Sequence, residues 1–156
     1  ITIMKGHVLF FLFITSSFCI AAETGKSPPI FSPNEIIRNG EDLMNGPQRV
    51  LVEFQVGSIQ TVPTGYPDGS THQVIHLIST EAEGNEGFSV PIEPQFLNRL
   101  KAIGIENIRA HFVGATVVLE GFVSGTARRI YGSPTEWTYH VSMNSFDTIR
   151  SIKRLK

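Results

Sequence analysis

The chain has 156 residues, of which 41% are hydrophobic and 17% charged, and its formal net charge is −1. This composition excludes an intrinsically disordered or collagen-like protein, and the length is that of one domain with enough chain for a hydrophobic core. The near-neutral charge gives no general attraction to nucleic acid.

The first 22 residues have the features of a secretory signal peptide. Lys5 supplies a positive charge, Val8–Ile20 is an apolar run too short to span a membrane comfortably, and Ala21 and Ala22 suit cleavage. We therefore expect an exported protein, periplasmic or extracellular, whose mature chain begins near Glu23. An anchor that stays uncleaved is the alternative interpretation.

Cys19 is the one cysteine of the chain, and it lies inside the predicted signal peptide. A lipoprotein anchored through Cys19 is a weaker alternative, because the bulky Phe18 stands where a lipidation signal has a small residue. After cleavage the chain would have no disulfide, no thiol nucleophile and no cysteine-type zinc site. Cleavage would also remove Lys5 and no acidic residue, which leaves 12 basic and 14 acidic residues and a net charge of −2.

Residues 23–48 are predicted to form a linker, because prolines and glycines recur through them. Within this segment, Ser32 followed by Glu35 suits the start of a helix, and we expect a short helix over Glu35–Met44. The remaining residues, 49–156, are predicted to form the folded domain.

From residue 50 onward, apolar and polar residues alternate in several short runs, which is the pattern of half-buried strands. One segment instead has apolar residues at helical spacing, after a proline that suits the first turn of a helix. In chain order, the predicted elements are the strands Val50–Ile59, His72–Ser79 and Gly87–Ile92, the helix Pro94–Ile103, and the strands Thr116–Ser124 and Trp137–Met143.

Three strands, one helix and two strands is the order of the OB-fold. We therefore predict an all-β fold with one short helix, a five-stranded Greek-key OB-like barrel with the helix between strands 3 and 4. Gly57 interrupts the first strand, where such a barrel needs a sharp bend. The alternation places Phe54, Leu100 and Leu119 in the core and Glu120 on the opposite, exposed face.

Two passages resemble known proteins. The sequence His111–Val123 is similar to a strand passage of OB-fold domains, in which a glycine precedes alternating valines, and His76–Thr80 resembles a passage of small exported bacterial OB-like domains of unassigned function. The resemblance covers Arg49–Ile152. Such domains resemble nucleic-acid-binding OB-folds, but Ala115 stands where the pattern has a basic residue, and the fold does not fix the function.

The sequence contains no recognisable catalytic or metal-binding set. His72 and His76 are four residues apart, which on a strand separates them by about 13 Å, too far for one metal ion. There is no nucleophile elbow, and the neighbouring acidic residues are interpreted as solvated loop charges. We therefore expect a protein that is not an enzyme, with no catalytic residue, metal or cofactor.

The loops after the first and fourth predicted strands carry aromatic and basic residues, and in OB-folds these two loops flank the ligand face. Aromatic rings stack on sugars or bases, and arginine pairs with anionic groups. The four predicted ligand-binding residues are Tyr66, Arg128, Arg129 and Tyr131. The alternative is that they only cover the loops and keep the protein soluble.

The function hypothesis is an exported binding or interaction module for an oligosaccharide, a peptide or another envelope protein, without a membrane span after cleavage. The alternative is a nucleic-acid-binding protein. Fold analogy and the basic residues of the last 30 positions favour that alternative, whereas export and the net charge of −2 disfavour it.

Overall fold

The computed structural model describes residues 27–65, 68–81, 87–128 and 136–154. The predicted signal peptide, its cleavage site and Cys19 lie outside these residues. The elements in chain order are β1 (Ile30–Phe31), α1 (Pro33–Asn45), β2 (Val50–Gly65), β3 (Thr71–Ser79), β4 (Phe88–Ile92), α2 (Pro94–Ala102), α3 (Ile108–Phe112), β5 (Ala115–Gly121), β6 (Ser124–Arg128), β7 (Glu136–His140), the 3-10 turn η1 (Phe146–Thr148) and β8 (Ile149–Arg154).

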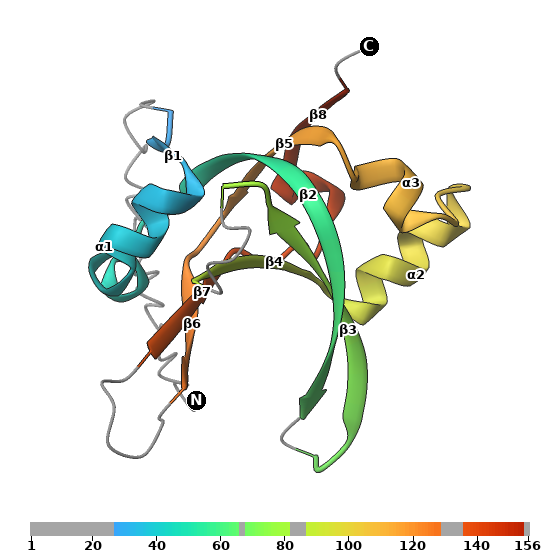
Figure 1. Cartoon of the computed structure of the whole chain (residues 1–156), viewed down its shortest axis with the longest axis horizontal. Helices are drawn as coiled ribbons and strands as arrows, with labels where there is room; N and C mark the ends of the chain where they lie inside the picture. Colours follow the sequence, from blue (N-terminus) through green and yellow to red (C-terminus); the bar gives the residue numbers. More distant parts are fainter. Residues whose placement is uncertain (1–26, 66–67, 82–86, 129–135, 155–156) are drawn as a thin grey trace, which may run out of the picture.

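The strands form one strongly curved sheet in the order β6-β7-β4-β3-β2-β5-β8, and β1 adds to β2 (Figure 1). The prediction of a mainly β fold is confirmed. The five-stranded closed barrel is wrong, because the sheet has eight strands, seven along one path and β1 beside β2. Three features account for the extra strands. Ser124–Arg128, which begins at the last residue of the fourth predicted strand and was otherwise expected to be a loop, pairs with β7 as β6. The C-terminal segment pairs with β5 as β8, and Ile30–Phe31 pairs with β2.

The long strand β2 joins the two halves of this sheet. It pairs with β5 through Val50–Gln55 and with β3 from Val56 to Gly65, six residues beyond its predicted end at Ile59. The register shifts between Val56 and Ser58, on either side of Gly57. A β-carbon on Gly57 would lie 2.9 Å from the side chain of Thr80, so the close approach of the two strands at this bend requires glycine.

Helix α1 belongs to the same core as the sheet. It starts with a capping box in which Ser32 and Glu35 bond reciprocally, with the Ser32 N–H donating to Glu35 Oε2 over 2.7 Å. Ile36 and Leu43 are buried in the hydrophobic core. Gly40 lies against the ring of Tyr139 on β7, where a β-carbon would approach the ring to 2.3 Å.

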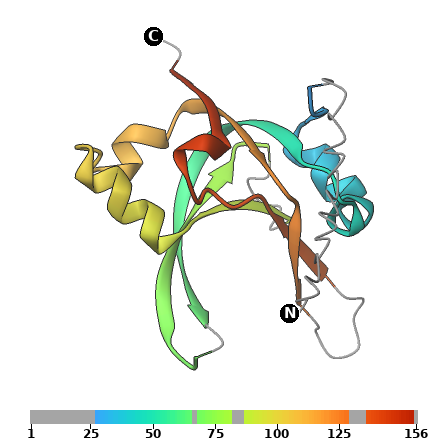
Figure 2. The same ribbon diagram turned by 180° about the vertical axis from the view of Figure 1, so that it is seen from behind.

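Helices α2 and α3 stand together at one side of the sheet, away from α1 (Figures 1 and 2). The predicted helix Pro94–Ile103 is confirmed in α2, whose Phe96 and Leu100 are buried. The short helix α3 was not predicted from the sequence. It is capped by Asn107, whose side-chain oxygen accepts the N–H of Ala110 over 2.8 Å.

The three predicted core residues Phe54, Leu100 and Leu119 are 2%, 1% and 0% exposed, as expected. The prediction that Glu120 is exposed is wrong, because this residue is only 8% exposed. Arg150 of β8 donates to its carboxylate over 2.6 Å, and Arg49 lies 3.4 Å away. These guanidinium groups, Arg150 first, hold the pKa of Glu120 below its usual value.

Candidate binding face

A row of hydrogen-bonded side chains crosses four neighbouring strands of the sheet. Ser89 of β4 stands between two histidines, with its Oγ 2.9 Å from Nδ1 of His76 on β3 and 3.0 Å from Nδ1 of His140 on β7. The other ring nitrogen of His140, Nε2, lies 3.2 Å from Oγ1 of Thr126 on β6. The row therefore links β3, β4, β7 and β6 in the order in which they pair.

The hydroxyl of Ser89 fixes how the two imidazoles share their protons. A hydroxyl has one proton to donate, so it donates to Nδ1 of one ring and accepts an N–H from Nδ1 of the other. The rings of His76 and His140 are edge to face, with centroids 5.9 Å apart. Ser89 is 5% exposed, whereas both imidazoles are only partly buried and keep part of their surface in solvent.

Both histidines are neutral at physiological pH. Burial, together with the neighbouring His140, lowers the pKa of His76 to about 4. Burial likewise lowers the pKa of His140. Each ring therefore presents an uncharged nitrogen donor or acceptor rather than a cation.

The residues that pair with this row are also uncharged, whereas the pair two residues outward on β6 and β7 is Arg128 with Glu136, one cation and one anion. In the sheet register, Gln60 and Pro91 flank His76, Ser124 stands opposite His140, and Thr138 stands opposite Thr126. Paired residues share a face of the sheet, and so do residues two apart on one strand. We call this surface the histidine face, and it comprises Gln60, His76, Ser89, Pro91, Ser124, Thr126, Thr138 and His140.

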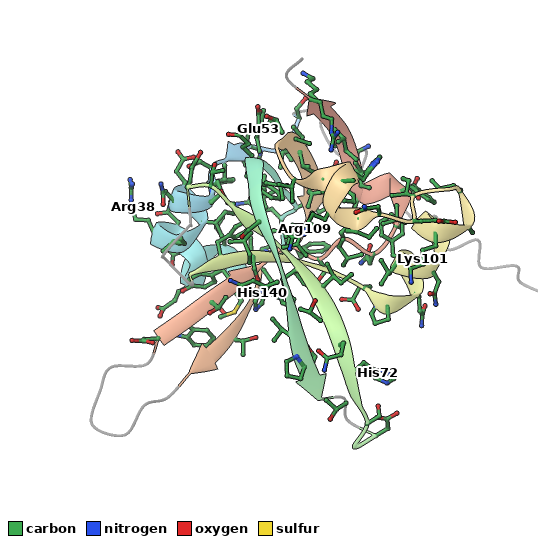
Figure 3. All side chains as sticks on the ribbon, turned by 45° about the vertical axis from the view of Figure 1, so that its right-hand side comes forward. Arg38, Glu53, His72, Lys101, Arg109 and His140 are labelled. Carbon is green, nitrogen blue, oxygen red and sulfur yellow. The ribbon has the colours of Figure 1, made fainter. Side chains whose placement is uncertain are left out.

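Two hairpin arms extend from the histidine face. The β2–β3 arm and the β6–β7 arm project to the same side of β4, and His140 lies near the base of the β6–β7 arm (Figures 1 and 3). The arms end in the connections between Gly65 and Thr71 and between Arg128 and Glu136. The histidine face therefore lies where the two hairpin arms leave the sheet.

Of the four ligand-binding residues predicted from the sequence, the structure describes Arg128 alone. Tyr66, Arg129 and Tyr131 lie outside the described residues. Arg128 is the last residue of β6, and its backbone pairs with Glu136. Their role in binding stays a prediction.

Sequence reasoning missed the histidine face itself. His76 lies in the apolar run Val74–Ile78, which reads as a strand buried on both faces. The parallel pairing of Ser89 with His140, which builds the row, joins strands 51 residues apart and leaves no local signal. The alternation of the strands did contain a signal for the face of these histidines. His76 and His140 each stand next to a buried residue, Leu77 and Tyr139, and therefore point to the opposite face of the sheet.

No protein family model matches the chain, and no curated protein matches it in sequence. The described residues contain no cluster of three or more histidine, cysteine, aspartate or glutamate side chains placed for a metal ion. Within the same residues, no helix has the length and apolar character needed to cross a membrane. The geometry of the histidine face is therefore the main guide to function.

Proposed function

We propose that this protein is an exported, non-enzymatic binding module of OB-like strand order, and that the histidine face holds its ligand. The strand path supports the OB-like interpretation. It begins on β6 and passes through β7, β4, β3 and β2 to β5, and only Phe122 and Val123 separate β5 from β6 in the chain. We interpret β5 and β6 as two halves of one bent fourth strand.

In OB-folds, ligands lie over strands 2 and 3, between the connections that follow strands 1 and 4. By strand order, the corresponding elements here are β3 and β4, and the corresponding connections follow β2 and β6. The row from His76 to Thr126 crosses this surface. In the sequence, these two connections contain Tyr66 and Tyr131.

The absence of charge on the histidine face favours a neutral oligosaccharide over the other candidate ligands. Nε2 of His76 and the side chains of Gln60 and Thr126 offer hydrogen bonds to sugar hydroxyls, and the imidazole faces provide contact area for a pyranose. Both ring nitrogens of His140 already bond to Ser89 and Thr126. This uncharged row is the observation on which the proposal depends. A peptide or an envelope protein is the second choice.

Nucleic acid is the alternative, but its binding depends on cations that neutralise phosphates. The basic side chains Arg150, Lys153 and Arg154 lie on β8, at the opposite end of the sheet path from β6. An enzymatic role for Ser89 would require a substrate to reach its hydroxyl, which the two imidazoles cover. Both arguments support a binding module for a neutral ligand.

A glycan array probed with the purified protein tests this proposal, with an oligonucleotide panel in parallel. Thr138→Arg places a long charged side chain on the histidine face, so it should weaken binding of an array hit at least tenfold. Gln55→Arg, on an exposed position of β2, makes the same change of charge elsewhere and should leave binding unaltered. Binding of oligonucleotides that weakens steeply with salt, without any glycan hit, would contradict the proposal.

A further inference from the structure

The opposite face of the β2–β3 ribbon forms a second candidate site. There the ribbon, α2 and α3 border a groove of about 580 Å³ that is open to solvent. Ile59 of β2 and Ile75 of β3 line its strand side, and Leu97 of α2 and Ile108 of α3 line its helix side. Ile59, Ile75 and Leu97 are only partly buried, so an apolar strip remains in contact with water.

Charged side chains stand at the helix side of this groove. Lys101, at the end of α2, and Arg109, on α3, both line it and are exposed, and Glu106 is the one acidic residue beside them. Within the described part of the chain, neither Lys101 nor Arg109 makes an ion pair. In Figure 3 Lys101 lies on the side of the two helices, well apart from His140.

The groove is formed in advance by the turn between α2 and α3. The N–H of Ile105 donates to the carbonyl of Leu100 over 3.0 Å, and the Asn107 side chain caps α3. Gly104 occupies the turn with a φ of +88°, which suits glycine. Because this turn is fixed by its own hydrogen bonds, a ligand need not organise it.

We propose that this groove binds a single-chain anionic amphiphile, such as a fatty acid, whose tail covers the apolar strip while Lys101 and Arg109 hold the head group. The volume lies within the range of about 300–1,000 Å³ that is typical of small-molecule sites, which are mostly apolar with a few placed polar groups. The excess of cations over Glu106 selects a negative head group. This site is independent of the histidine face, because Ile75 and His76 are consecutive residues that point to opposite faces of β3.

Calorimetric titration of the purified protein with laurate, below its micellar concentration, tests the inference. We expect saturable binding with one site. Dodecyl maltoside, which has the same tail and a neutral head, should bind at least tenfold more weakly, and acetate should not bind measurably. Equal affinity for laurate and dodecyl maltoside would overturn the role of the cations, and lack of saturable laurate binding would overturn the site.

Two double variants, which change the net charge by the same amount, test whether laurate binds in the groove. Lys101→Glu/Arg109→Glu should weaken laurate binding at least tenfold, whereas Arg38→Glu/Lys153→Glu, with exposed cations outside the groove, should not change it. Equal weakening in both variants would show general electrostatic attraction and contradict the groove. Arg109→Gln serves as a milder variant, and circular dichroism checks that each variant is folded.

Discussion

Consecutive residues of β3 point to opposite faces of the sheet and meet different surroundings. Ile75, with Thr61 beside it on β2, lines the groove against α2 and α3. His76, with Gln60 beside it, belongs to the histidine face and bonds to Ser89. One ribbon therefore carries an apolar surface with cations at its margin and a polar surface without charge.

This comparison shows how the two faces are stabilised. The Ile75 face continues into the core, where Leu77 is completely buried and apolar packing holds the strand. The His76 face depends on hydrogen bonds between Ser89 and two imidazoles, whose pKa values are lowered by burial. Changes on the apolar face, on the histidine face and on a charged surface outside both should therefore differ in their effect on stability.

The largest effect should follow from Leu77→Ala, on the apolar face. Deleting a fully buried leucine side chain costs about 2–5 kcal/mol of unfolding free energy, because it removes burial and leaves a cavity. Urea unfolding measures this loss. Gln60→Ala, at an exposed position of the histidine face, should cost less than about 0.5 kcal/mol, and equal costs would show that the faces are assigned wrongly.

Ser89→Ala should have the next largest effect. It removes the hydroxyl shared by His76 and His140 and leaves two partly buried ring nitrogens without this partner, at a cost of about 1–3 kcal/mol. Ser124→Ala removes a hydroxyl from an exposed position of the same face and should cost less than about 0.5 kcal/mol. If both variants unfold at the same urea concentration, the Ser89 bridge does not stabilise the fold.

The pH dependence of stability should come next in size. The pKa of His76 is near 6.5 in the unfolded chain and about 4 in the folded protein, so the unfolded chain binds more protons between these values. Stability should therefore fall as the pH falls from about 6.5 to 4 and level off below that. The contribution is about 1–2 kcal/mol once the partial exposure of the ring is taken into account.

His76→Gln provides the control for this titration. Carboxylates whose pKa values are lowered, such as Glu120, also lose stabilising interactions as the pH falls, and they remain in the variant. The difference between wild type and variant between pH 7 and 4 then reports the histidine. A difference that does not change with pH would contradict neutral burial of His76.

The smallest effect should follow from Glu120→Ala, on a charged surface outside both faces. Its partners Arg150 and Arg49 have side chains that are 51% and 53% exposed, so water can solvate them after the change. The cost should stay below about 1 kcal/mol and should shrink in 1 M NaCl, because salt screens exposed ion pairs. The cost of Ser89→Ala should not depend on salt, and a salt-dependent cost would mean that its row carries charge.

Local patterns in the sequence predicted most strands and two of the helices. Alternation located β3, β4 and β7 to within a few residues, and Ser32 with Glu35 located the start of α1. The parts of the sheet that were not predicted depend on pairing between residues far apart in the sequence. The continuation of β2 to Gly65 requires β3 beside it, and β8 forms only because β5 offers a free edge.

The candidate site was predictable only in part. The order of strands and helices predicts two loops beside a ligand surface, and this stays a prediction, because their residues Tyr66, Arg129 and Tyr131 lie outside the described residues. The row of His76, Ser89 and His140 depends on the register between β4 and β7, which no local pattern encodes. The burial of Glu120 likewise required its partner Arg150, 30 residues later in the chain.

A nuclear magnetic resonance titration of the wild-type protein with the strongest neutral glycan from the array tests most directly whether the histidine face is the ligand surface. The imidazole signals of His76 and His140 and the methyl signals of Ile59 and Ile75 report the two faces of one ribbon in a single experiment. We predict that the imidazole signals shift saturably with the glycan while the methyl signals stay unchanged. Shifts of the methyl signals with unmoved imidazoles would contradict the assignment of the histidine face as the ligand surface.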